Sequence, residues 1–217
     1  MLVVRRAVVG PFAMNAWLAG CDRTGDAILV DPGDEVTRVL ALAEPGGFQV
    51  KRIVLTHGHI DHVSGAAEAR EGTGAPLQLH PDDRAWLDAL PRQAEMFGLE
   101  VPPVPAVDHL QADGETFRVG EHEAKVLHTP GHSRGSCSIF FPVSRDLFVG
   151  DTLFVGAVGR TDLPGGDPAA LARSIREVLF PLGDDVRFHP GHGPSGTLGE
   201  ERRTNPFVGE RARRRLY

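Results

Sequence analysis

Three histidines and an aspartate crowd into the six residues from His57 to His62, directly after a short apolar segment at residues 51–55. The length and apolar character of that segment predict a buried strand. Gly58 allows the chain to turn tightly after the strand, so that neighbouring side chains can converge. Residues 63–69 predict the start of a helix, and α/β folds place their sites where a strand leads into a helix.

This set of side chains indicates a metal site. Imidazole nitrogen and carboxylate oxygen together suit zinc, iron or manganese. A polar loop with fortuitous histidines is the alternative, but the chain has only 10 histidines and supplies further ligands elsewhere. Neither Cys21 nor Cys137 adjoins the cluster, so a thiolate ligand is not expected.

The rest of the chain alternates between strand and helix patterns. Helices are predicted after an N-cap at Asp34, over residues 81–90, and after an N-cap at Asp167 with Pro168 at the first position. Strands are predicted at residues 2–9, 15–21, 27–31, 75–79, 115–119, 122–127, 137–143, 146–149 and 186–189. Strands followed by a helix in each half suggest two packed sheets with helices outside.

Residues 91–108 carry four prolines and read as an irregular excursion over the surface. Long loops in compact domains are often functional. A flap over the site is therefore favoured slightly over a plain connection.

Composition excludes several classes of protein. The 217 residues are 41% hydrophobic, carry a net charge of −6, and have no apolar run long enough to span a bilayer. Neither a nucleic acid nor a membrane is expected as a partner. With two cysteines and no signal-peptide pattern, a cytoplasmic protein with buried thiols is the simplest expectation; whether Cys21 and Cys137 meet is left open, as is the oligomeric state. The basic C-terminal residues Arg211 and Arg213–Arg215 are interpreted as a solvated terminal helix.

The same local form occurs four times: a strand, a glycine-rich turn, and then a ligand-type residue. Seven ligands are too many for one open zinc site but suit two metals if one carboxylate bridges them. Asp151 is the natural bridge, since a carboxylate has two oxygens. The candidate ligands are His57, His59, Asp61, His62, His132, Asp151 and His192.

The roles of other polar residues follow less directly from the sequence. Asp31 is either an ordinary turn residue or an acceptor that fixes the tautomer of a ligand histidine. The remaining histidines are interpreted as non-ligands, although His128 and His189 lie nearest the ligand turns; the five are His80, His109, His122, His128 and His189.

These motifs resemble the metallo-β-lactamase superfamily: His57-x-His59-x-Asp61-His62, then His132 after Thr-Pro-Gly, then Gly150-Asp151, then Gly191-His192-Gly193. The resemblance extends over residues 3–205. Within the superfamily the chain is most similar to glyoxalase II, and residues 159–166 and 202–207 resemble a short bacterial glyoxalase II-like branch. That branch lacks the C-terminal helical domain with which long glyoxalases II hold glutathione, so the resemblance determines the chemistry better than the substrate.

The resemblance implies an α+β fold, a four-layer αββα sandwich formed by one domain over residues 1–217, with the metals at one edge. It implies two divalent ions per chain, zinc by preference, or iron or manganese. His57, His59 and His132 would hold the first, and Asp61, His62 and His192 the second, with Asp151 bridging.

The implied activity is hydrolysis of a small-molecule thioester such as S-lactoylglutathione by a hydroxide that bridges the metals, with Asp61 and Asp151 as catalytic residues. Arg160 could bind the substrate carboxylate bidentately, as a basic residue at the comparable place contacts glutathione in glyoxalases II. The alternative for Arg160 is a surface ion pair with Asp162.

Four rival functions fit parts of this sequence pattern. The serious one is a mononuclear iron persulfide dioxygenase, which shares a loop like Gly159–Asp162 but differs in its final turn. A β-lactamase is disfavoured because lactamases of this fold lack an aspartate at the Asp151 position. A nuclease is disfavoured by the net charge, and a metal-binding module without turnover by the intact ligands in all four turns.

Overall fold

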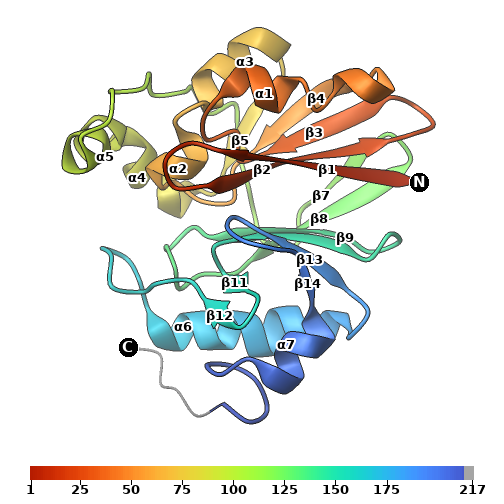
Figure 1. Cartoon of the computed structure of the whole chain (residues 1–217), viewed down its shortest axis with the longest axis vertical. Helices are drawn as coiled ribbons and strands as arrows, with labels where there is room; N and C mark the ends of the chain where they lie inside the picture. The colour runs from red at the N-terminus through yellow and green to blue at the C-terminus, as the bar shows by residue number, and fades with distance from the viewer. Residues whose placement is uncertain (213–217) are drawn as a thin grey trace.

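The computed structural model describes residues 1–212 and consists of two six-stranded sheets packed face to face, with helices on both outer faces (Figure 1). The first sheet has the order β1-β2-β3-β4-β5-β6, with bounds Leu2–Val9, Met14–Cys21, Asp26–Val30, Gln49–Val54, Leu77–Leu79 and His109–Leu110. The second has the order β14-β13-β10-β9-β8-β7, with bounds Gly196–Thr197, Arg187–Pro190, Asp146–Gly150, Cys137–Phe141, His122–His128 and Thr116–Val119. A small hairpin joins β11 (Leu153–Phe154) to β12 (Ala157–Val158).

The helices divide between the two outer layers (Figure 1). The first half of the chain contributes α1 to α5, with bounds Val36–Leu40, Ile60–Val63, Ala66–Thr73, Arg84–Asp88 and Leu90–Phe97. The second half contributes α6 (Pro168–Arg173), which continues as a π-helical segment over Ser174–Leu179, and α7 (Leu198–Thr204). The predicted four-layer αββα arrangement is confirmed.

The buried hydrophobic side chains form three separate clusters, because successive side chains of a strand point to opposite faces of a sheet. Every residue of β2 is buried. Ala16 and Leu18 pack among the residues under the outer helices, whereas Trp17 and Ala19 pack between the two sheets. A third cluster, including Leu171 and Ile175, lies between the second sheet and its helices.

Strand directions bring the ligand turns to one edge. Strands β8 and β10 are both antiparallel to β9, and β13 is parallel to β10, so β8, β10 and β13 end on the same side. The turn after β4 meets them, since the carbonyl of Thr56 accepts a hydrogen bond of 2.8 Å from the Cys137 amide of the second sheet.

The predicted strands agree with the structure to within two residues at each end. The two-residue strands β6, β11, β12 and β14 were not predicted, because two residues carry no periodicity. Asp34 is not the N-cap of α1: Glu35 occupies that position, and Asp34 accepts a hydrogen bond from the Glu35 amide at 2.6 Å.

The prediction of an irregular segment at residues 91–108 is wrong for its first part. Helix α5 runs over Leu90–Phe97, and Pro91 lies in its first turn, where no intrahelical donor is lost. Residues 98–108 contain the other three prolines and form neither helix nor strand.

Both cysteines are buried free thiols, as expected. Within the described part of the chain, none of the helices has the length and apolar character needed to cross a bilayer. Of the basic C-terminal residues, Arg213–Arg215 lie outside the described residues.

Candidate metal centre

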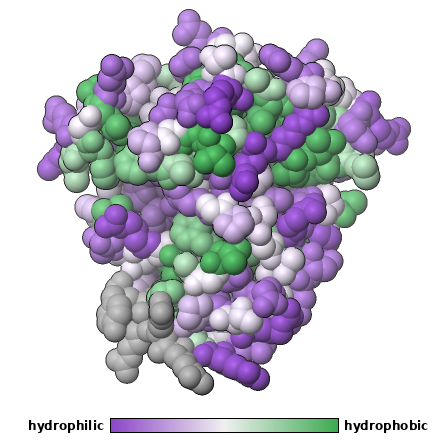
Figure 2. Space-filling model, viewed as in Figure 1, coloured by the Kyte–Doolittle hydropathy of each residue, from purple (hydrophilic) through white to green (hydrophobic). Residues whose placement is uncertain are grey.

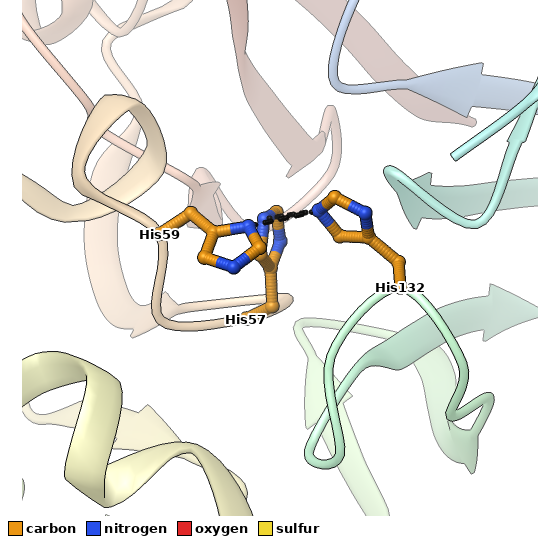
Figure 3. A group of neighbouring side chains, drawn as sticks. All are labelled: His57, His59 and His132. Carbon is orange, nitrogen blue, oxygen red and sulfur yellow. Dashed lines mark hydrogen bonds between the residues drawn. The ribbon is translucent and has the colours of Figure 1, made fainter. Parts of the chain in front are cut away.

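His57, His59 and His132 form a buried group, termed here the histidine group (Figure 3). His57 and His59 come from the turn between β4 and α2, and His132 from the turn between β8 and β9. Nε2 of His132 lies 2.9 Å from Nδ1 of His59 and 3.3 Å from Nε2 of His57. Two nitrogen ligands of one tetrahedral zinc lie about 3.3 Å apart, so the group fits one metal ion.

The tautomer of His132 supports this assignment. Its Nδ1 donates a hydrogen bond of 2.8 Å to the carbonyl of Arg160, so the lone pair of Nε2 faces the other two imidazoles. Burial, together with the neighbouring histidines, holds the pKa of His57 well below its ordinary value. Burial and then His132 lower the pKa of His59 to about 3. His57 and His59 are therefore neutral, as metal ligands must be.

Asp61, His62 and His192 form a second group, termed the mixed group. Oδ2 of Asp61 lies 3.1 Å from Nε2 of His192 and 3.7 Å from Nε2 of His62. Nε2 of His62 is buried and has no hydrogen-bond partner within residues 1–212. A buried nitrogen without a partner is costly, and a cation among these three side chains would satisfy it.

Asp151 lies between the two groups. Its Oδ1 is 3.3 Å from Nε2 of His62, and its Oδ2 is 3.6 Å from Nε2 of His192 and 3.7 Å from Nε2 of His132. Like Nε2 of His62, Oδ1 is buried without a hydrogen-bond partner among the described residues. Asp151 thus reaches both groups, and the residues present fit a pair of metal ions.

Electrostatics differ between the two groups. Burial alone would disfavour the charged forms in the mixed group, but opposite charges outweigh it. The carboxylates of Asp151 and Asp61 raise the pKa of His62 well above its ordinary value, and the cationic His62 in turn lowers the pKa of both carboxyls. Both carboxylates therefore stay ionised at neutral pH, and a metal ion at the mixed group would displace the proton of His62.

Asp31 lies behind the mixed group and fixes His62. Its Oδ2 accepts a hydrogen bond of 2.9 Å from Nδ1 of His62 and one of 2.6 Å from Oγ1 of Thr56, and its Oδ1 accepts 2.7 Å from the Thr56 amide. Asp31 is thus an acceptor for a candidate ligand histidine, which is the second of the two interpretations of this residue.

Asp83 connects the two turns that carry the histidine group, and sequence reasoning missed it. This fully buried carboxylate accepts hydrogen bonds from the Gly58 amide at 2.9 Å, the Ser133 hydroxyl at 2.6 Å and the Gly135 amide at 2.7 Å. The sequence predicts Asp83 only as part of a helix over residues 81–90. No local signal could have revealed its role, because its partners are 25, 50 and 52 residues away.

His189, His80 and His128 have partners outside the two groups. His189 pairs with Asp146 at 2.9 Å. His80, Asp82 and His128 come close enough to suggest another metal group, but the rings of His80 and His128 are stacked, with centroids 4.2 Å apart and planes at 9°. Imidazole lone pairs lie in the ring plane, so two nearly parallel planes offer no shared coordination point.

A cleft of about 930 Å³ opens onto both metal groups. Helix α5 lines it with Gln93, Met96 and Phe97, so the segment expected to be a flap over the site contributes a helical wall. Arg160 also lines the cleft, and its guanidinium forms a bidentate ion pair with Asp162, with distances of 2.7 and 2.8 Å.

Comparison with known proteins places this fold in one superfamily. The model of the metallo-beta-lactamase superfamily matches residues 9–195. Hydroxyacylglutathione hydrolase GloC of Haemophilus influenzae is 36% identical over 94% of this chain and 97% of its own length. The structure of TTHA1623 in a di-iron-bound form is 40% identical with a TM-score of 0.83, covering 93% of this chain and 98% of that chain. BLEG-1 B3 metallo-beta-lactamase is 33% identical with a TM-score of 0.88, covering 95% of this chain and 99% of that chain.

The hydrolases among these relatives support the interpretation of this chain as a metal-dependent hydrolase. The family match covers most of the sequence, and the four-layer fold carries His and Asp groups that could bind metals at its edge. The chain therefore belongs to the metallo-beta-lactamase superfamily.

Proposed function

We propose that this protein is a binuclear hydrolase of small-molecule thioesters. The histidine group would hold one divalent ion and the mixed group the other, with zinc, iron or manganese as candidates because nitrogen and oxygen ligands discriminate poorly between them. The observation that carries the proposal is the position of Asp151, within 3.7 Å of ligand nitrogens in both groups.

The chemistry follows from the ligands. When bound, two such ions supply a water of lowered pKa and positive charge opposite a developing oxyanion. Asp61 would accept a proton at a carboxylate oxygen, and Asp151 would hold the two groups at a fixed separation, because its oxygens reach nitrogens of both. Departure of the thiolate needs little proton donation, because thiols have a pKa near 8.5.

Two other activities are the rivals. A mononuclear iron persulfide dioxygenase would use two histidines and one aspartate, and would leave most of the mixed group without a role. A β-lactamase gains support from BLEG-1, a relative described as a B3 metallo-beta-lactamase. The relative named hydroxyacylglutathione hydrolase favours the thioester.

One experiment separates these activities. The purified protein is loaded in turn with zinc, iron or manganese, and its metal content is counted by mass spectrometry. Each form is then assayed for hydrolysis of S-lactoylglutathione, for oxygen uptake with glutathione persulfide and for hydrolysis of a chromogenic cephalosporin. We expect two metals per chain and hydrolysis of the thioester. Oxygen uptake or cephalosporin turnover in the absence of thioester hydrolysis would overturn the proposal.

A further inference from the structure

An apolar wall borders the cleft on the side of α4 and α5. Phe12 from the β1–β2 turn, Trp86 from α4 and Phe97 from α5 line it. The rings of Phe12 and Phe97 meet edge to face with centroids 5.2 Å apart, and the ring of Trp86 contacts that of His59 at 4.6 Å. The wall therefore begins at a candidate metal ligand and continues outward.

The outer part of this wall is uncovered. Phe12 is 37% exposed, Phe97 50% and Met96 72%. Figure 2 shows hydrophobic side chains at the surface over α4 and α5. A cluster of exposed large apolar side chains beside a cleft marks a ligand surface.

The second half of the chain lines the cleft with Leu163, Pro164 and an available cation, Arg134. Arg134 follows the candidate ligand His132 by two residues. Its side chain packs beside Gly165, where an added Cβ would lie 3.3 Å from its Cγ.

No carboxylate of residues 1–212 lies within ion-pair distance of the Arg134 guanidinium, in contrast to the bidentate pair that occupies Arg160. Arg92 on α5 also lines the cleft and likewise has no ion pair within the described residues. The cleft thus presents two arginines whose charge is not already balanced.

We infer that the preferred substrate is an amphipathic thioester, with an apolar acyl arm along the wall of Phe12, Trp86 and Phe97 and an anionic thiol carrier paired with Arg134. This inference rests on the proposed thioester hydrolysis and names its substrate class. A cleft of about 930 Å³ exceeds what a two- or three-carbon acyl group fills. A carboxylate on the carrier would pair with a guanidinium without displacing another acid.

The test varies the two arms independently. Acetyl, butanoyl and hexanoyl thioesters of 3-mercaptopropionate, and of its uncharged amide, are assayed with the metal-loaded protein. We expect kcat/KM to rise about two- to fourfold per added methylene, as apolar burial predicts, and to be about tenfold higher with the carboxylate carrier.

Two variants test which residues contact the acyl group and which contact the thiol carrier. Phe97→Ser should flatten the dependence on acyl length and keep the preference for the charged carrier, whereas Arg134→Gln should do the reverse. Val143→Ser, at a position 85% exposed in the β9–β10 turn, and Arg38→Gln on α1 serve as matched controls and should change neither trend.

The outcomes separate this inference from the function on which it rests. Hydrolysis that is indifferent to acyl length and to carrier charge overturns the inference and leaves thioester hydrolysis standing. If no thioester is hydrolysed, the proposed function fails, and calorimetry with S-methyl, S-butyl and S-hexyl thioethers of the same two carriers decides the inference. Equal affinities across that series would overturn it.

Discussion

Asp31 and His62 share a hydrogen bond of 2.9 Å between Oδ2 and Nδ1, although 31 residues separate them. The bond directs the other nitrogen of His62 toward Asp61 and Asp151. Asp31 has a φ of 51°, in the left-handed region that non-glycine residues rarely adopt. This strained conformation aims one carboxylate at both Thr56 and His62, so backbone strain contributes to the geometry of the centre.

Replacing Asp31 by Asn tests this relationship. The Asn amide keeps one acceptor oxygen, but its NH2 group would face Thr56 or His62, which are themselves donors to Asp31. We therefore expect a 10- to 100-fold loss of metal affinity at the mixed group. Competition titration with a chromogenic chelator measures it. Asp34→Asn is the matched control, since Asp34 is exposed in the same turn; equal affinities of the two variants would refute the role of Asp31.

Replacing the bridging candidate should affect both groups at once. We expect two metals per chain in the wild type and loss of both metal binding and activity in Asp151→Ala, because Asp151 reaches both groups. His80→Ala should retain both properties, since His80 is stacked on His128 away from the centre. Metal counting by mass spectrometry gives the answer, and similar losses in the two variants would contradict the assignment.

Sequence reasoning identified the centre because its ligands follow strands at glycine-rich turns. His57, Asp151 and His192 each lie within three residues of a strand end, and parallel strands bring such ends together. Strand positions were predictable because β2 and β10 are buried throughout and therefore consist mostly of apolar residues.

What sequence reasoning missed depends on contacts between distant segments. Asp83 acts through amides up to 52 residues away, and a carboxylate next to a predicted helix start gives no hint of them. Helix α5 was missed because Pro91 suggested a break, although proline is tolerated in a first turn. The ion pair of Arg160 with Asp162 was weighed, but only the structure orients both side chains.

Asp83→Asn should weaken the histidine group selectively. The Asn side chain has one carbonyl oxygen as acceptor, so it cannot accept all three hydrogen bonds that the Asp83 carboxylate accepts. The turns that carry His59 and His132 are then less firmly connected. We expect at least tenfold weaker binding of the metal at this group, with a smaller change at the mixed group. Cobalt spectra can distinguish the two sites, and Asp88→Asn, an exposed change on α4, is the control. Parallel weakening of both sites would indicate a general structural effect.

A pH-dependent contribution to stability is expected at the edge of the first sheet. Hydrogen bonds from Arg70 and the Leu77 amide lower the pKa of Asp108 from 3.8 to about 2. A carboxyl with a depressed folded-state pKa stabilises the fold above pH 4, and this contribution is lost as the pH falls toward 2. Arg70→Gln should lower the unfolding free energy only slightly at pH 6, because solvent screens this exposed ion pair. In denaturant titrations, its difference from the wild type should shrink between pH 4 and pH 2; a growing difference would refute this.

Arg160 is a further candidate for binding the substrate, and its backbone and its side chain make different contacts. Its carbonyl accepts the hydrogen bond from His132, whereas its guanidinium pairs with Asp162. Arg160→Ala removes only the second contact, so the metal centre should keep its affinity.

If Arg160 binds the substrate carboxylate, Arg160→Ala should raise KM for a glutathione thioester and spare an uncharged thioester, with kcat unchanged for both, because the loss falls equally on the ground and transition states. Steady-state kinetics on the two substrates provide the measurement. An equal response would show that the guanidinium serves its ion pair with Asp162. Asp162→Asn is the informative companion: it frees the guanidinium, so it should lower KM for the charged substrate if Arg160 can reach it. An unchanged KM in Asp162→Asn, together with equal effects in Arg160→Ala, would leave Arg134 as the cation that meets the substrate.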